Sequence, residues 1–570
     1  MCGIAGFIDK KNTITEKERE RVVKKMIHLM KHRGGDAEGI KSIKNISIGH
    51  TRLSIVDTSS RGNQPFSDEN NNFILSFNGE IYNHCLLRSK YLNHVRIISG
   101  SDTATLFELL KRFSIESVLA KIHGMFAFSF LVTKKKSELI LALDRFAIKP
   151  LYFIDTPRYF AWASEIKAFR ALPGFNFQIN KSVLGEYMVF RHVVGPETLF
   201  KNIYKIQAGE YLRYNLKNDT NKVQKYYRLS KKWSAPRFSE SVISESVKDH
   251  LMGDIIAGVQ LSGGVDSSLV ALFAQKLSQK KLHTFSIGLV GGLWNEFGYS
   301  DIVADKLDTK HHKIIFSKRD FVQLLPKVIY HLDEPLVHPN TVPMYILAKK
   351  ARKYTKVLLT GEGADEVFYG YNRYFQESNV IKDKIFSNAF DNPQLISQIF
   401  KGRISLVNRK KIFRNTVKFD DESKISFYDI YTYLPHILLR QDKVGMAANI
   451  ENRVPFLYTP VVEAGFNSRT RVGKFGGKTQ VKKIALKYFP KNLVLRRKCG
   501  FGLPISEWLR DRNGLLPHLL KLKKHKLIKK FFVINEIERL IKEHLYKEKD
   551  NSSVLFTLIC LSIWHDVFID

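Results

Sequence analysis

The sequence has few cysteines and no long apolar run. Its 570 residues include four cysteines, Cys2, Cys85, Cys499 and Cys560, without metal-ligand spacing. So few cysteines in so long a chain do not make a disulfide framework, and a functional cysteine should therefore be a free thiol. The longest apolar run, residues 554–564, is far shorter than the ~20 residues of a membrane helix, and the N-terminus lacks an apolar signal core. We therefore expect a cytoplasmic protein with no membrane partner.

Acidic residues are also scarce relative to basic ones. The chain has 55 Asp and Glu against 91 Lys and Arg, a formal net charge of +36. Such a balance can indicate binding to nucleic acid or to a membrane surface. The lysines are spread along the whole chain, and we interpret the run at 521–530 as the solvated face of a helix. We expect no nucleic-acid partner, and the charge suits anionic substrates such as ATP without singling them out.

The pattern of expected secondary structure changes near residue 240. Before it, short β-like runs such as 46–50, 73–77 and 126–132 predict stacked antiparallel sheets with helices, an α+β domain. Thr15 and Glu18 form the capping-box pair of one clear helix. After residue 240, strand candidates alternate with helices, which predicts an α/β doubly wound parallel sheet. The expected domains are 2–205 and 241–570, joined by a linker over 206–240.

The N-terminal sequence MCGIAGF places a cysteine next to the initiator methionine. If that methionine is removed, Cys2 carries both a thiol and an α-amine, so a nucleophile and its base lie on one residue. Gly3 and Gly6 would allow close packing or close approach of a substrate. The alternative is a buried first strand with an inert cysteine.

The motifs HRGGD (32–36), RLSIVD (52–57), NGEIYN (78–83) and SGSD (99–102) follow in order. An amide hydrolase that acts on glutamine needs an oxyanion hole, which Asn78 and Gly79 can form. Arg52 can pair with the substrate carboxylate, and Glu80 and Asp102 can hold its ammonium group. Taken singly, Arg52 and Asp102 could equally be structural or surface residues.

A second cluster of motifs lies in the predicted parallel-sheet domain. LSGGVDSS (261–268) follows an apolar strand and opens a helix, so its N–H groups and hydroxyls can surround a polyphosphate. It lacks the GK[ST] of a Walker A loop. GEGADE (361–366) comes at the end of the strand candidate 356–360, where Asp365 could hold Mg²⁺ together with Asp266. Glu362 could act as a general base, and Lys478 could neutralise a leaving pyrophosphate.

These motifs, together with ENRVPFL (451–457), resemble the glutamine-hydrolysing asparagine synthetase family over nearly the whole chain. The first half resembles the class II glutamine amidotransferase domain, of the N-terminal nucleophile type, and the SGGVDSS loop resembles the PP-motif of ATP pyrophosphatases. The resemblance implies hydrolysis of glutamine, activation of aspartate by ATP with Mg²⁺ as β-aspartyl-AMP, and its amination to asparagine. ATP is then a substrate, as are glutamine and aspartate, and a homodimer is compatible with the pattern.

The resemblance also assigns roles to residues at matching positions. The implied catalytic residues are Cys2, Asn78, Gly79, Glu362 and Lys478. The implied glutamine-binding residues are Arg52, Leu53, Ser54, Ile55, Val56, Asn78, Gly79, Glu80 and Asp102. The implied ATP-binding residues are Leu261, Ser262, Gly263, Gly264, Asp266, Ser267, Ser268, Ile287, Thr360 and Gly361, with Asp266 and Asp365 on the metal. The sequence departs from the family pattern at Gly35, Ala147, Gln260, Tyr369 and Tyr458.

Three other functions remain open on the sequence. The same machinery could amidate another carboxylate, such as a sugar acid in surface-polysaccharide assembly. An RNA-modifying PP-loop enzyme would suit the charge of +36, but that class needs no N-terminal glutaminase. A non-catalytic relative would not need every chemical group listed above to be present.

Overall fold

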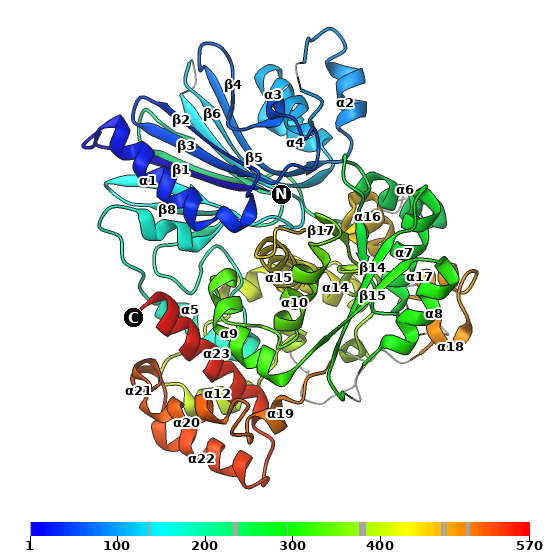
Figure 1. Cartoon of the computed structure of the whole chain (residues 1–570). Coiled ribbons are helices and arrows are strands. Elements are labelled where there is room, and N and C mark those ends of the chain that lie inside the picture. The colour runs from blue at the N-terminus through cyan, green and yellow to red at the C-terminus, as the bar shows by residue number, and fades with distance from the viewer. Residues whose placement is uncertain are drawn as a thin grey trace.

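The structure is a computed structural model, and it describes residues 2–97, 99–134, 137–231, 237–292, 295–375, 384–468, 472–473, 476–496 and 502–570. An N-terminal body of sheets lies against a larger body of helices around a third sheet (Figure 1). Among the described residues, no helix is both long enough and apolar enough to cross a membrane.

The N-terminal body contains two antiparallel sheets of six strands each, as the β-like runs predicted. The strand orders are β10-β8-β9-β1-β3-β2 and β12-β11-β7-β6-β5-β4. The first sheet comprises β1 (Gly3–Asp9), β2 (Ala37–Ile43), β3 (Ile46–Arg52), β8 (Tyr152–Asp155), β9 (Tyr159–Ala163) and β10 (Tyr204–Lys205). The second comprises β4 (Phe66–Ser67), β5 (Phe73–Ile81), β6 (Gly124–Val132), β7 (Glu138–Leu143), β11 (Glu210–Asn215) and β12 (Thr220–Lys225).

Side-chain alternation along the strands explains how the two sheets stack. On β1, Ile4 and Ile8 join the core shared with the second sheet, whereas Ala5 and Phe7 face the cluster that contains helix α1. The capping box of Thr15 and Glu18 starts α1 (Glu16–Leu29), which packs on the first sheet. The outer face of the second sheet is covered by helices from a separate cluster. These are α2 (His84–Tyr91), α3 (Asp102–Arg112) and α4 (Ile115–Lys121), and α5 (Lys181–Phe190) follows later in the chain.

The second body is built on a five-stranded parallel sheet with the order β15-β14-β13-β16-β17. Its strands are β13 (Gly258–Gln260), β14 (His283–Leu289), β15 (Lys310–Phe316), β16 (Val357–Leu359) and β17 (Glu451–Arg453). The helices around it are α6 (Glu240–His250), α7 (Val265–Leu277), α8 (Phe297–Leu307), α9 (Lys318–Leu332), α10 (Thr341–Ala351) and α11 (Ala364–Phe368). The strand order reverses direction between β13 and β16, and ligands bind at such a switch point in doubly wound sheets.

Helices dominate the chain after residue 390 (Figure 1). They are α12 (Pro393–Ile399), α13 (Val407–Arg414), α14 (Asp421–Thr432), α15 (Leu434–Met446), α16 (Thr459–Phe466), α17 (Thr479–Ala485), α18 (Lys491–Val494), α19 (Ile505–Trp508), α20 (Leu516–Lys521), α21 (Lys526–Phe531), α22 (Ile534–Leu545) and α23 (Ser552–Phe568). The apolar run at 554–564 lies in α23 and is almost wholly buried. Its Trp564 Nε1 donates to the carbonyl of Asp333, 3.0 Å away, so α23 is a core helix.

Two strands lie within the span that the sequence assigned to a linker. β11 pairs with β7, and β12 pairs with β11, which extends the second sheet of the N-terminal body. Tyr211, Leu212 and Tyr214 of β11 are buried. The polar composition of residues 216–225 concealed β12, because it is an edge strand with a mostly exposed surface.

Candidate active sites

Cys2 lies directly before β1, beside β5, the strand next to the edge strand β4 of the second sheet. The Cys2 N–H donates to Asn78 Oδ1 at 3.0 Å. The amide nitrogen of Asn78 is fully buried and has no hydrogen-bond partner within the described part of the chain. A buried donor without a partner is costly unless a ligand satisfies it, so Asn78 Nδ2 is suited to an oxyanion.

Gly79 is required by the same strand for steric reasons. Its φ is +153°, and a Cβ built there would lie 2.0 Å from the carbonyl oxygen of Met125 on β6. A side chain at this position would break the pairing of β5 with β6 that presents Asn78. Asn78 and Gly79 are therefore positioned together at adjacent positions of β5.

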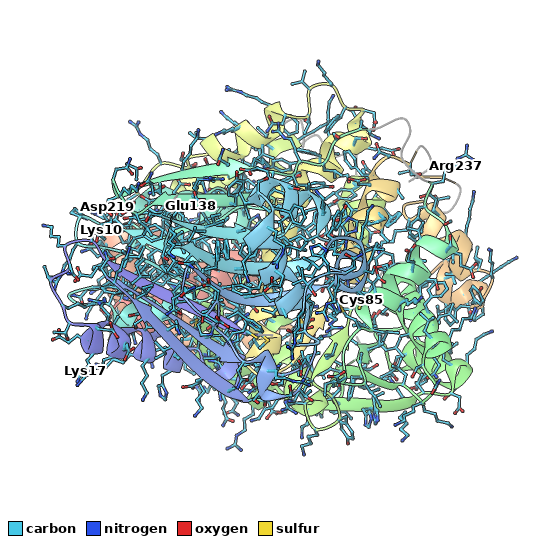
Figure 2. All side chains as sticks on the ribbon, turned by 90° about the horizontal axis from the view of Figure 1, so that it is seen from above. Lys10, Lys17, Cys85, Glu138, Asp219 and Arg237 are labelled. Carbon is cyan, nitrogen blue, oxygen red and sulfur yellow. The ribbon has the colours of Figure 1, made fainter. Side chains whose placement is uncertain are left out.

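The Cys2 thiol is buried, and burial raises its pKa although the Leu53 N–H donates a hydrogen bond to it. A thiol in this setting needs a base, because only the thiolate is a strong nucleophile. Of the other described cysteines, Cys85 is exposed on α2 (Figure 2) and Cys560 is buried in α23. Cys499 lies outside the described residues.

The groups predicted to hold the amino-acid end of glutamine lie around this thiol. Arg52, at the end of β3, donates to the Ser59 carbonyl at 2.7 Å and to Asn63 Oδ1 at 2.8 Å, and it also bonds the Asp57 carbonyl. Asp102 is the first residue of α3 and accepts from the Ile81 N–H at 2.8 Å. The arginine therefore closes the loop at 56–63 over one side of the site.

The pKa values of the two acidic groups of this site are both raised. Burial raises the pKa of Asp102 to about 6, against the Ile81 and Thr103 N–H groups that lower it. Burial, with Glu451 and Asp102 nearby, raises the pKa of Glu80 well above its usual range. A cationic ligand would favour their ionised forms, so this pair suits an ammonium group.

The segment 53–56 joins the glutamine site to the second body. Leu53 and Ile55 belong to a core cluster that contains residues of the parallel-sheet domain. The Ile55 carbonyl accepts from the Asp254 N–H at 2.9 Å, and the Ser54 N–H donates to Asp36 at 2.8 Å. The Val56 carbonyl accepts a long bond from Arg52. The Leu53 N–H donates a hydrogen bond to the Cys2 thiol.

A cavity of about 520 Å³ opens at the switch point of the parallel sheet. Residues from the end of β13, from β14, from the end of β16 and from the segment before α17 line it. Of the predicted residues, the lining includes Leu261, Ser262, Gly264, Asp266, Ser267, Ile287, Thr360, Gly361, Glu362, Asp365 and Lys478. Adjacent parallel strands end at the same edge of a sheet, which is why these motifs meet.

Gly263 and Ser268 support the loop rather than line the cavity. Gly263 has φ +68°, and a Cβ there would lie 2.6 Å from the Ser300 N on α8. The hydroxyls of Ser267 and Ser268 donate to the Gly264 carbonyl at 3.1 and 2.8 Å. These bonds fix the turn that aims the N–H groups of the loop at the cavity.

Lys478 joins the two acidic motifs of the cavity. Its Nζ lies 2.5 Å from Asp266 Oδ2 and 2.8 Å from Asp365 Oδ1. Burial alone would lower the pKa of Lys478, but the two carboxylates raise it above its usual range. Two carboxylates this close, beside phosphate-binding loops, match the donor set that Mg²⁺ takes on a nucleotide.

Glu362 is held by two residues that the sequence analysis did not single out. Arg440 Nη2 and Gln441 Nε2, both on α15, donate to Glu362 Oε1 at 2.9 and 3.0 Å. Both residues belong to the segment LLRQDKVG (438–445). The polar residues in this helical segment were the feature of the sequence that could have indicated a role.

One arginine connects the two sites through a side chain and a backbone group. Arg453 Nη2 lies 3.5 Å from Glu80, while its Nε donates to Glu451 at 2.6 Å. Its carbonyl accepts from the Thr360 N–H at 2.9 Å. The sequence analysis gave Arg453 no role, since the contact spans 373 positions.

The positions that depart from the family pattern have distinct surroundings. Ala147 and Tyr369 adopt φ of +59° and +63°, where glycine is the unstrained residue. Gln260 lines the nucleotide-sized cavity and donates to Asn452 at 3.1 Å. The Tyr458 ring packs near Tyr82 and His250. Around Gly35, the nearest atom to a built Cβ is Asn449 Oδ1 at 3.8 Å.

Two family models cover these sites. The model described as a glutamine amidotransferase domain matches residues 1–227, and the asparagine synthase model matches residues 239–566. The fold, with a sandwich of antiparallel sheets and a parallel-sheet domain in one chain, and these matches define a glutamine-dependent amidotransferase ligase. The chain belongs to the asparagine synthase family, whose members use ATP as a substrate.

The chain is similar to curated proteins over most of its length. Asparagine synthetase (glutamine-hydrolyzing) 1 of Bacillus subtilis (strain 168) is 29% identical, with 100% of this chain and 97% of the relative covered. Asparagine synthetase B (glutamine-hydrolyzing) of Escherichia coli (strain K12) is 30% identical, over 88% of this chain and 82% of the relative. Asparagine synthetase (glutamine-hydrolyzing) 3 of Arabidopsis thaliana is 29% identical, over 96% and 86%.

Proposed function

We propose that this protein makes asparagine from aspartate, with glutamine as the ammonia donor and ATP as the activating substrate. The observation that carries the proposal is the junction of Asp266, Asp365 and Lys478 in the switch-point cavity. That junction is suited to a nucleotide polyphosphate, and the same chain holds Cys2 beside Asn78. The names of the relatives support aspartate as the acceptor.

The first half-reaction takes place at Cys2. Once the initiator methionine is removed, the α-amine takes the thiol proton and the sulfur attacks the side-chain amide carbon of glutamine. Asn78 Nδ2 and the Gly79 N–H stabilise the oxyanion, and ammonia leaves as the thioester forms. Water then hydrolyses the thioester, which releases glutamate and restores the thiol. Arg52 pairs with the glutamine carboxylate, and Glu80 and Asp102 hold its ammonium group.

The second half-reaction takes place at the switch-point cavity. The β-carboxylate of aspartate attacks the α-phosphorus of ATP, which gives β-aspartyl-AMP and pyrophosphate. Lys478 and the SGGVDSS loop neutralise the charge on the leaving pyrophosphate. Mg²⁺, held by Asp266 and Asp365, supplies further charge neutralisation on the phosphates when bound.

Ammonia from the first site then completes the reaction. It attacks the activated carboxyl carbon, Glu362 accepts a proton from the attacking nitrogen, and AMP leaves as asparagine forms. The hydrogen bonds from Arg440 and Gln441 hold the Glu362 carboxylate in position for this step. Passage of ammonia inside the protein keeps it unprotonated and keeps water from the adenylate.

We place the boundary between the two catalytic domains at residues 228–238, between the spans that the two family models match. On this division, the N-terminal domain releases ammonia and the C-terminal domain consumes it. The sequence-based linker at 206–240 overlaps this segment, but its first part belongs to β11 and β12.

The acceptor is tested by measuring pyrophosphate release in the presence of glutamine and ATP. Aspartate, glucuronate and galacturonate are offered separately, and the amidated product is identified by mass spectrometry. We expect pyrophosphate, AMP and asparagine to form in equal amounts when aspartate is the acceptor, and no turnover with either sugar acid. Turnover with a sugar acid and none with aspartate would replace the proposed acceptor while leaving the two-site chemistry intact.

A further inference from the structure

A second cavity, of about 330 Å³, lies where the two bodies meet and shares no residue with the nucleotide-sized cavity. One wall comes from the sandwich and its connections and includes Lys149, Tyr152 and Lys205. The opposite wall comes from α13, α14 and α15 and includes Lys411 and His436. None of the residues proposed above for catalysis or substrate binding lines it.

The lining of this interdomain cavity carries a large excess of positive charge. Five basic side chains line it, namely Lys149, Lys205, Lys225, Arg228 and Lys411, and Glu210 is the single carboxylate among its lining residues. This local charge is a feature of the cavity and differs from the general spread of lysines over the surface.

These basic groups differ in how many carboxylates lie near them. Lys149 is paired with Asp442 at 3.4 Å. Lys205 donates to the Val193 carbonyl at 2.7 Å and has the carboxylates of Glu186, Glu197 and Glu334 in its surroundings. Lys225 approaches Glu210 only to 4.0 Å. Arg228 and Lys411 have no ion pair or hydrogen bond through their side chains with the described residues. Like charges held around one cavity favour an anion between them.

The cavity also has apolar and aromatic walls. Tyr152, Ile206, Phe427 and Tyr431 line it beside the basic groups, and the Lys225 ammonium lies 5.1 Å from the centroid of the Tyr431 ring. His436 is 6% exposed, and its Nδ1 has no partner within the described part of the chain. Apolar walls with a few convergent polar groups are the usual composition of small-molecule sites.

We propose that this interdomain cavity binds a small organic anion, with its phosphate or carboxylate head between the basic side chains and an aromatic body against Tyr152 and Tyr431. Because the two walls belong to different domains, the bound anion stabilises their present arrangement. The ligand therefore acts as an effector of the enzyme rather than as a substrate, and the site does not depend on the identity of the acceptor.

Phenyl phosphate is the probe for this site, with benzoate as the carboxylate and benzamide as the neutral molecule of similar size. Isothermal titration is performed on the full chain with the nucleotide cavity saturated by a non-hydrolysable ATP analogue. We expect saturable binding of phenyl phosphate or of benzoate at one site, and none of benzamide. Binding of benzamide as tight as that of both anions, or no saturable binding of either anion, would overturn the proposal.

Charge-reversed variants locate the binding. In the double variant Lys225→Glu and Lys411→Glu, we expect the affinity for the anion to fall at least about tenfold, since its charge-assisted contacts are lost. The matched control is Lys222→Glu with Lys410→Glu, exposed positions on the same two elements that do not line the cavity. Glutamine hydrolysis by both double variants reports that they are folded. Equal losses of affinity in the two double variants would refute a local site and indicate general surface charge.

Discussion

At the scale of single residues, Cys2 owes its chemistry to its neighbours. A cysteine at position 2 says little alone, because a buried thiol with a raised pKa is an inert group in many cores. Here the adjacent Asn78 offers a buried amide donor that no described residue satisfies. The same strand places Gly79 and Glu80 beside it. The chemistry of the thiol is thus inseparable from β5.

The Cys2→Ala variant separates the two half-reactions. We expect it to lose glutamine-dependent amidation by about 10³-fold or more, since a nucleophile in a covalent mechanism is removed. Amidation with free ammonium should remain, because the cavity at the parallel sheet is untouched. Asparagine is measured with each nitrogen source. Loss of both activities in a variant with an unchanged Tm would contradict the division of labour.

The raised pKa of Asp102 predicts an acid limb in the glutaminase activity. Burial raises this pKa to about 6, so the carboxylate is ionised above that pH and neutral below it. We expect kcat/KM for glutamine to fall as the pH drops through about 6, because the proposed ammonium partner loses its charge. The measurement is a pH profile of the wild-type protein and of Asp102→Asn. An identical acid limb in the variant would assign the titration to another group.

At the scale of elements, the nucleotide-sized cavity depends on two short strands and the turns after them. β13 and β16 pair in parallel, so their carboxyl ends bring Asp266 and Asp365 to one place. Lys478, which precedes α17, reaches both carboxylates from a different part of the chain. The strand–turn–helix pattern predicted the first two residues, whereas the position of Lys478 depends on how α17 packs.

A substitution at Gly263 should strain the turn after β13. Gly263→Ala should destabilise the loop by at least about 1–2 kcal/mol, because an L residue is strained at positive φ. The added Cβ also meets backbone atoms of α8. We expect a raised KM for ATP in pyrophosphate exchange and a lowered Tm.

Gly298→Ala is the matched control for this loop variant. Gly298 lies on the neighbouring helix α8, and a Cβ built there meets nothing within 4 Å. Its KM for ATP should equal that of the wild-type protein, and its Tm should not fall. If Gly263→Ala behaved like Gly298→Ala, the strain assigned to the turn would be wrong.

At the scale of the whole molecule, buried ion pairs hold the two bodies together beside the first site. Arg33 is fully buried, with Glu165 at 2.9 Å in its own body and Asp442 of α15 at 2.8 Å. Its Nε also donates to the Cys2 carbonyl at 3.0 Å. Lys10 and Asp219, labelled in Figure 2, lie by contrast at the far end of the sandwich. The Arg33 guanidinium thus contacts both Asp442 across the interface and the backbone of the residue that carries the thiol.

Removal of this guanidinium tests the interface. Arg33→Met should cost about 3–5 kcal/mol, because it removes one buried charge partner from each of Glu165 and Asp442. Scanning calorimetry should show a lower Tm, and glutamine hydrolysis should fall with it. Arg112→Met, which removes a half-exposed pair with Glu108 on α3, should change the Tm little. Similar Tm changes in the two variants would contradict the role given to Arg33.

The class of each domain could be predicted from the order of residues along the chain. Periodicity of two along the first strands, and strand–helix alternation later, depend on local residue order and therefore could be read directly. Cys2, Asn78, Asp266 and Asp365 were found in this way because each lies within a short motif with a defined backbone context.

Contacts between groups far apart in the chain depend on the tertiary structure. Residues far apart in the chain meet in three places. Arg453 contacts Glu80, Arg440 of α15 donates to Glu362, and segments of both bodies line the interdomain cavity. No local pattern encodes such contacts, since they depend on how the two bodies pack. The edge strand β12 was missed for a related reason: a strand paired on one side and exposed on its faces needs no apolar pattern.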